Sequence, residues 1–415
     1  MEEPIEPSLN EKTANYDDAA HANDEKKKVI LEACGQGDLD ALRALAESQG
    51  GFLTDNIRQQ AWPILLGLPP SHDKTESGSD GTPSSPSWES LPRHKDEDQV
   101  QLDVNRAFIY YPEHQTEAQL THHKSLLSTL ITSLLRTHPY LSYFQGYHDI
   151  AQVLLLTLPP PLHLPSLTHL SLLHIRDFML PSLAPAIAQL RLIPDILKAA
   201  DPPLWQHLSS TEPFFALSGT LTMYAHDITT LGEITRLFDV LLARDPVFTV
   251  YLFAAIIRSR RAELFDTPPD EPEMLHSILS KLPVPLDLEG LIAQAVALER
   301  DVPPRRLPSW RRGVSRWSVL KTGRGGGQQR REGGQGEGVE EQGRVWFERQ
   351  VRELRWEEGK KKVGRWVWRR RRPVGMVGVA VLVGVLAVLL RRGPLPGPVV
   401  SGLGWVSGLL VRWWR

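Results

Sequence analysis

Two short stretches of the chain place chemically useful side chains close together. Asp103 and Arg106 lie three residues apart in VQLDVNRAF, a spacing that puts both on one helical face. Gln145 precedes Gly146 in YLSYFQGYHDI, between aromatic residues and ahead of an apolar run. Arginine is permanently charged and offers a planar fork of donors, and a glutamine amide donates and accepts hydrogen bonds without titrating. Such a pair can neutralise developing negative charge and orient a water molecule.

A third stretch, IRQQAWPILLG, carries Arg58 and Trp62 four residues apart. Taken singly, each stretch has an ordinary explanation. An Arg–Trp pair usually packs, an Asp–Arg pair is usually a surface salt bridge of little energetic value, and a Gln before Gly usually caps a helix or fills a turn. The order of the three stretches is therefore more informative than any one of them.

In this order the stretches resemble the TBC domain of Rab GTPase-activating proteins. The family patterns are R-x-x-x-W-x-x-L-L-G, then I-x-x-D-x-x-R, then Y-x-Q-G. The corresponding residues here are Arg58, Trp62, Leu65, Leu66, Gly67, Val100, Asp103, Arg106, Tyr143, Gln145 and Gly146. Weaker elements follow over 213–228 and 234–246, and the resemblance covers roughly residues 35–300.

The resemblance implies an activator of a Rab-family small GTPase, not an enzyme with a substrate of its own. Phosphoryl transfer from GTP to water builds charge on the phosphate oxygens and needs a water molecule held in line. The family pattern implies Arg106 as an arginine finger and Gln145 as a glutamine finger, both supplied in trans. Asp103 is then expected to orient Arg106 through a hydrogen-bonded pair.

The remaining matched residues have supporting roles in this interpretation. Gly146 is expected to let the backbone approach the partner without a Cβ in the way. Arg58, Trp62 and Tyr143 are expected to support the fold around the site rather than to touch nucleotide. No cofactor of the chain's own is expected, because GTP and Mg would come with the partner, and the scattered histidines lack metal-ligand spacing. Two alternatives stay open: a non-catalytic Rab-binding scaffold, and a membrane tether on the same fold.

The elements that must position these residues read as helices. Apolar periodicity punctuated by proline predicts an all-α, multi-helix domain over residues 27–304, after a polar and disordered stretch at 1–26. The Ser-, Pro- and Gly-rich residues 71–98 read as a loop insertion. Helical segments are expected over 53–70, 116–137, 145–157, 166–178, 183–199, 213–226, 230–243, 247–263, 271–281 and 287–300.

The C-terminal part differs in composition. Residues 305–372 contain 21 Lys and Arg against 8 Asp and Glu, and they read as a Gly-rich basic linker with an amphipathic juxtamembrane helix over 344–362. The uncharged residues 373–390 would span about 27 Å as a helix, near the thickness of a hydrocarbon core. A transmembrane helix is therefore expected there, and the apolar tail 391–415 leaves open a second membrane segment.

The flanking charge orients this anchor. The cationic cluster in 364–372 predicts that the long N-terminal body faces the cytosol. A basic block beside an apolar span fits anionic lipid headgroups better than nucleic acid. A C-terminal anchor joined to a TBC domain resembles the subgroup acting in the early secretory pathway, so the endoplasmic reticulum is the expected location. The lone Cys34 excludes an internal disulfide framework and a cysteine-based zinc cluster.

Overall fold

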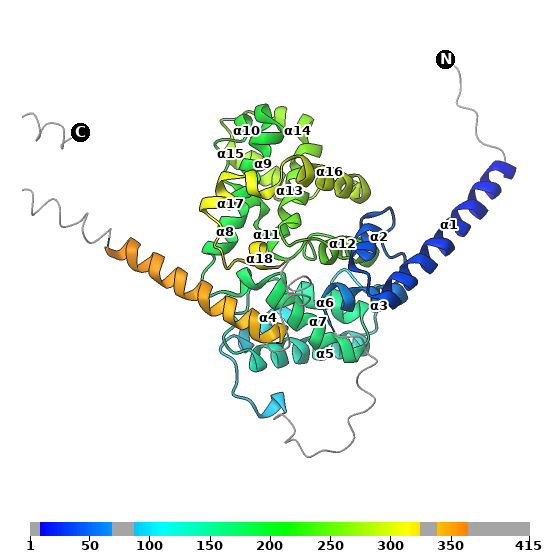
Figure 1. Cartoon of the computed structure of the whole chain (residues 1–415), viewed down its shortest axis with the longest axis horizontal. Coiled ribbons are helices and arrows are strands. Elements are labelled where there is room, and N and C mark those ends of the chain that lie inside the picture. Colours follow the sequence, from blue (N-terminus) through cyan, green and yellow to red (C-terminus); the bar gives the residue numbers. More distant parts are fainter. Residues whose placement is uncertain (1–8, 69–86, 324–337, 364–415) are drawn as a thin grey trace, which may run out of the picture. The chain divides into compact units, whose positions relative to one another are not determined.

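The computed structural model of the chain describes residues 9–68, 87–323 and 338–363, and these form helices joined by turns, with no strand among them (Figure 1). The all-α fold predicted from the sequence is confirmed. The helices are α1 Leu9–Gln36, α2 Leu39–Glu47, α3 Asp55–Leu65, η2 Trp88–Ser90, α4 Glu97–Val104, α5 Glu117–Thr137, α6 Tyr147–Thr157, α7 Pro160–Leu173, η3 Arg176–Met179, α8 Ala184–Leu190, α9 Leu192–Ala200, α10 Pro202–His207, η4 Pro213–Ala216, α11 Leu217–Leu221, α12 Leu231–Ala243, α13 Phe248–Ser259, α14 Arg261–Phe265, α15 Pro272–Leu279, α16 Leu288–Asp301, η5 Pro304–Arg306, α17 Pro308–Arg312 and α18 Val319–Thr322. A final helix runs over residues 339–363.

Side-chain caps fix where several of these helices begin. Thr116 and Gln119 form a capping box at α5, in which each side chain satisfies a backbone N–H of the other residue. The side chain of Thr230 accepts from the N–H of Glu233 at α12, and that of Asp287 accepts from Gly290 at α16. These caps lie within one residue of the helix starts that the sequence predicts.

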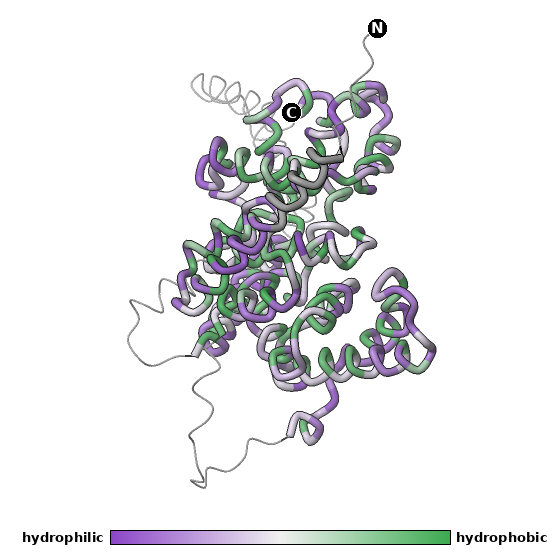
Figure 2. Tube along the Cα trace, turned by 90° about the vertical axis from the view of Figure 1, so that its right-hand side faces the viewer, coloured by the Kyte–Doolittle hydropathy of each residue, from purple (hydrophilic) through white to green (hydrophobic). Residues whose placement is uncertain are grey.

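The helical body extends to Val351, and its core is centred on α12 and α13. From Ile234 to Ala243 every residue of α12 is buried, because this helix packs against α2, α3, α6 and α16. Helix α13 packs along α16 and α9, and α5, α6 and α7 pack against one another (Figure 1). Along the outer helices hydrophilic and hydrophobic residues alternate, so that purple and green follow each other in Figure 2.

Several boundaries differ from the predicted ones. Residues 9–26 belong to α1, whereas their polar composition predicts disorder; no proline or glycine interrupts the helix there. Helix α3 ends at Leu65, short of the predicted residue 70, because Gly67 adopts a left-handed φ of 76°. Helix α7 begins at Pro160, with proline in the first turn, and tolerates Pro165 inside it.

Parts of the predicted insertion and linker are packed against the body. His94 is buried, and α4 begins at Glu97 within the stretch 71–98. Val319 and Leu320 of α18 are also buried, although residues 305–372 read as a linker. In both places buried polar side chains form hydrogen bonds with the helical body. Composition alone does not predict such contacts.

The predicted amphipathic helix over 344–362 is present, within the helix over residues 339–363. Among the residues that the structure describes, no helix is long and apolar enough to cross a membrane. The predicted span at 373–390, its cationic flank at 364–372 and the tail at 391–415 all lie outside those residues.

Candidate functional site

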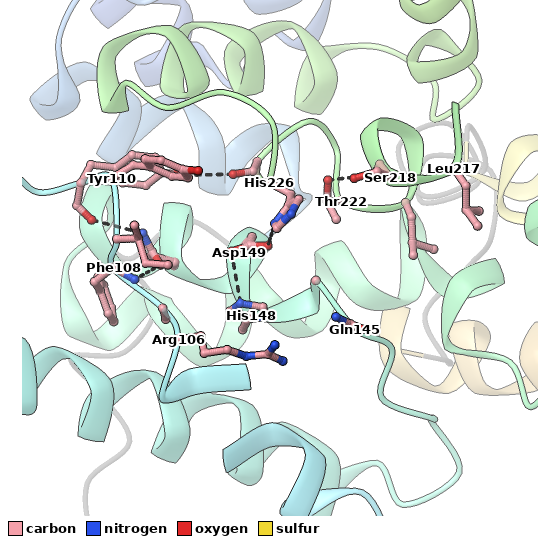
Figure 3. A pocket seen from close by; sticks show the side chains of 17 residues that line it. Arg106, Phe108, Tyr110, Gln145, His148, Asp149, Leu217, Ser218, Thr222 and His226 are labelled. Atoms are coloured by element: carbon pink, nitrogen blue, oxygen red, sulfur yellow. Dashed lines mark hydrogen bonds and ion pairs between the residues drawn. The ribbon is translucent and has the colours of Figure 1, made fainter. Parts of the chain in front are cut away.

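Two loops bring Arg106 and Gln145 to one open cleft of about 500 Å³ (Figure 3). Arg106 follows the end of α4, and Gln145 lies in the turn before α6. The Arg106 side chain is 63% exposed, and Gln145 is also exposed. Both predicted finger residues are therefore available to a partner that docks on this cleft.

Asp103 anchors the base of this site from a fully buried position. Its Oδ1 accepts hydrogen bonds from Nη2 of Arg106 over 2.7 Å and from Nε2 of Gln99 over 3.0 Å. Its Oδ2 accepts from the hydroxyl of Tyr143 over 2.9 Å. Burial, followed by the nearby Asp103 carboxylate, raises the pKa of Tyr143 far above its usual value, so this hydroxyl stays a donor. Asp103 thus ties the Arg106 loop to the Gln145 loop.

Gly146 begins α6 with a φ of 94°, in the left-handed region that favours glycine. A Cβ at this position would lie only 2.5 Å from Cγ2 of Thr222. The space beside Gly146 is therefore filled by the chain itself. This internal contact accounts for glycine before α6 without any approach by a partner.

Arg58 and Trp62 do not line the cleft but converge on the buried Asp239 of α12. Arg58 donates from Nε and Nη2 to the two carboxylate oxygens over 3.0 and 3.1 Å. The indole Nε1 of Trp62 donates over 2.8 Å, and the backbone N–H of Phe52 over 3.0 Å. Arg58 also pairs with Asp55 over 2.8 Å. These contacts hold α3 against α12, away from the residues that line the cleft.

A second polar cluster lines the cleft, and it joins the adjacent His148 and Asp149 to His226, which the sequence does not single out. Oδ1 of Asp149 lies 3.3 Å from Nε2 of His148, and its Oδ2 lies 2.9 Å from Nδ1 of His226 (Figure 3). The hydrogen bond to Asp149 raises the pKa of His226, whereas burial lowers the pKa of His148. The adjacent pair in YHDI is visible in the sequence, but His226 is 77 residues away from Asp149, and no local pattern joins them.

The loop after Arg106 is held by Gln152 of α6. Its Oε1 accepts the N–H of Phe108 over 3.1 Å, and its Nε2 donates to the carbonyl of Tyr111 over 3.2 Å. Phe108 has a φ of 62°, an uncommon conformation for a residue with a side chain. A buried amide therefore fixes the path of the chain that leaves Arg106. The described parts of the chain contain no group of three or more His, Cys, Asp or Glu residues that could hold a metal ion.

Sequence comparison identifies the chain as a TBC-domain protein of the Rab GTPase-activating class. The model of the Rab-GTPase-TBC domain matches residues 55–265, and the chain belongs to this family. It is 35% identical over 299 residues to GTPase-activating protein gyp10 of Schizosaccharomyces pombe, covering 71% of this chain and 78% of that protein. It is 33% identical to human TBC1 domain family member 20, covering 69% of this chain and 71% of that protein.

A solved structure, the Ypt/Rab-GAP domain of Gyp1p, is also similar. It is 17% identical, covers 63% of this chain and 93% of its own, and superposes with a TM-score of 0.47. Family membership and relatives named as GTPase-activating proteins support a Rab GTPase-activating function for this chain.

Proposed function

We propose that this chain accelerates GTP hydrolysis by a Rab-family GTPase and supplies Arg106 and Gln145 in trans. The observation that supports the proposal is that both residues are exposed at one cleft, while the buried Asp103 accepts hydrogen bonds from both loops. Ile109 and Tyr110 follow Arg106 and are 73% and 53% exposed. They give the rim of the cleft an apolar surface on which the partner can dock.

In this mechanism the guanidinium of Arg106 neutralises charge that develops on the phosphate oxygens of the partner's GTP. Asp103 uses one Nη donor and leaves the other donors of the fork free for the nucleotide. The amide of Gln145 orients the attacking water, because it donates and accepts at once. GTP and Mg belong to the partner, and the chain contributes side chains only.

The decisive experiment measures single-turnover GTP hydrolysis against a panel of Rab GTPases. Arg106→Ala and Gln145→Ala should each lower the stimulated rate by at least about 10²-fold while Rab binding persists. Arg300→Ala is a matched control, because Arg300 is 75% exposed and, among the described residues, forms its ion pair with its neighbour Asp301. Binding without acceleration by the wild type would favour a scaffold, and a chain that neither binds nor activates a Rab would favour a tether.

The location is a separate part of the proposal. Residues 373–390 carry no charge and follow a cationic cluster, which fits a transmembrane anchor flanked by anionic lipid. The body then acts on Rab at a membrane of the endoplasmic reticulum or early secretory pathway, regulating vesicle traffic. Full-length protein should stay in the pellet after alkaline carbonate extraction, and a version ending at Gly359 should become soluble. Full-length protein in the supernatant would exclude the anchor.

A further inference from the structure

Residues 339–351 of the final helix lie outside the matched domain yet pack on the body with one face. The residues of this face recur at helical spacing, and all of them are buried. They are Gly343, Trp346, Phe347, Gln350 and Val351. A Cβ on Gly343 would lie 2.9 Å from Cβ of Leu172, so glycine allows the helix to approach α7 closely.

The helix is fastened to the single turn η3. Nε2 of Gln350 donates to Oδ1 of Asp177 over 3.0 Å, and both side chains are buried. The guanidinium of Arg176 lies 5.3 Å from the ring centre of Trp346. Arg176 is itself buried and donates to the carbonyl of Trp317 over 2.8 Å. This turn is therefore shared between the body and the C-terminal segments.

The other end of η3 holds the loop that carries Gln145. The carbonyl of Met179 accepts the N–H of Ser142 over 2.8 Å. The rings of Phe178 and Phe144 meet edge to face at 6.0 Å. Since Phe144 directly precedes Gln145, a shift of η3 displaces the glutamine.

A direct contact joins the helix to the same loop. The ring of Phe347 lies 5.0 Å from the ring of Tyr140, and Phe347 is 4% exposed. Tyr140 lies in the segment between α5 and α6, which runs from His138 to Gly146. The loop therefore contacts the helix over residues 339–363 through Tyr140, and it contacts η3 through Ser142 and Phe144.

We propose that residues 339–351 position the Gln145 loop, so that the helix preceding the predicted anchor controls the glutamine more strongly than the arginine. This rests on the proposed function of Gln145. Phe347 and Gly343 are positioning residues, since they would act through Tyr140 and η3 and do not line the cleft. A displacement of about 1 Å in a catalytic group can cost up to about 10²-fold in rate.

The kinetic test compares two glycines of one helix in the full chain. Gly343→Ala forces the helix away from α7, whereas Gly359→Ala meets no atom within 4 Å and serves as the matched control. With a responsive Rab, Gly343→Ala and Phe347→Ala should each lower kcat roughly tenfold with KM nearly unchanged, and Phe347→Leu should recover most of the rate. Gly359→Ala should behave as the wild type.

Double variants that combine Gly343→Ala with a substitution of either finger residue distinguish an effect on the position of Gln145 from a general loss of structure. In a Gln145→Ala background, Gly343→Ala should cause little further loss, whereas in an Arg106→Ala background most of the tenfold loss should persist. An equal loss in both backgrounds would overturn the proposal, because the helix would then support the whole fold.

Hydrogen exchange tests the same coupling without any Rab. Gly343→Ala should speed exchange of the Ser142 and Tyr143 amides roughly tenfold and leave α16 unchanged, because only the loop loses its support. Unchanged exchange at Ser142 and Tyr143 would also overturn the proposal. If no Rab responds to the wild type, the proposed function fails, and exchange still decides whether the helix holds the loop.

Discussion

Arg106 reaches from an exposed loop to the wholly buried Asp103, and its Nη2 lies 2.7 Å from Oδ1 of that carboxylate. The charged tip that a partner would meet is thus fixed from the interior of the protein. Asp103 accepts three hydrogen bonds, so its own position is determined before any partner arrives. An arginine that is already oriented loses less conformational entropy when it binds phosphate.

Asp103→Asn should therefore weaken activation without loss of binding. The amide has the volume of the carboxylate but lacks the charge that strengthens the hydrogen bond from Arg106. We expect kcat for Rab-stimulated hydrolysis to fall by about tenfold, with KM within about twofold. Single-turnover hydrolysis measures both. Asp301→Asn alters an exposed pair with Arg300 and should change neither value; a wild-type kcat in Asp103→Asn would contradict this role.

Gly146→Ala should disable the Gln145 turn through contact with Thr222. The new methyl group would lie 2.5 Å from Cγ2 of Thr222, and the φ of 94° adds backbone strain of about 1 kcal/mol. Thr222→Ser removes only that methyl group and keeps the hydroxyl that donates to the carbonyl of Ser218. The double variant should recover part of the activity in the hydrolysis assay. Activity of Gly146→Ala equal to wild type would show that the turn is not constrained.

Arg58→Ala should affect stability rather than catalysis. It leaves the buried Asp239 without its guanidinium, and breaking a buried ion pair typically costs about 3–5 kcal/mol. Urea unfolding should show this loss, while Arg300→Ala stays within about 0.5 kcal/mol of wild type. Protein that remains folded should keep its kcat, because Arg58 lies away from the cleft. A selective loss of kcat with normal stability would assign Arg58 a different role.

His174 should make the protein less stable in acid. Burial lowers its pKa from 6.5 to about 4, and its Nδ1 is buried without a hydrogen-bond partner. Between these two values the unfolded chain binds a proton that the folded chain does not. The free energy of unfolding should therefore decrease as the pH is lowered, by up to about 1.4 kcal/mol per pH unit for this group. Urea unfolding of His174→Leu at pH 7 and pH 5 should show a smaller difference than wild type.

Long helices with clear caps could be predicted from the sequence, and contacts across the fold could not. The predicted helix over 116–137 differs from α5 by one residue, because Thr116 and Gln119 mark its start locally. The predicted start at 166 for α7 is wrong, since burial of α7 against its neighbours outweighs the prolines within it. A local sequence pattern therefore predicts a helix start where a side-chain cap marks it, but it does not predict the packing that decides the other ends.

The candidate site divides in the same way. Arg106 and Gln145 could be predicted as finger residues, because each lies in a recognisable sequence motif. The partner of Arg58 was not, because Asp239 is 181 residues away and stands in a helix that reads as ordinary apolar core. The contact between Phe347 and Tyr140 has no sequence signal at all, since an aromatic on an amphipathic helix does not specify what it packs against.

The distance along the chain between Arg58 and Asp239 has a consequence for how each new molecule is made. Arg58 leaves the ribosome 181 residues ahead of its carboxylate, which at typical synthesis speeds of about 5–20 residues per second is about 10 to 40 s. Throughout that interval α3 has neither the ion pair of Arg58 with Asp239 nor the indole hydrogen bond of Trp62. The nascent N-terminal helices must therefore wait for α12, and folding can be completed only after more than half of the polypeptide has been translated.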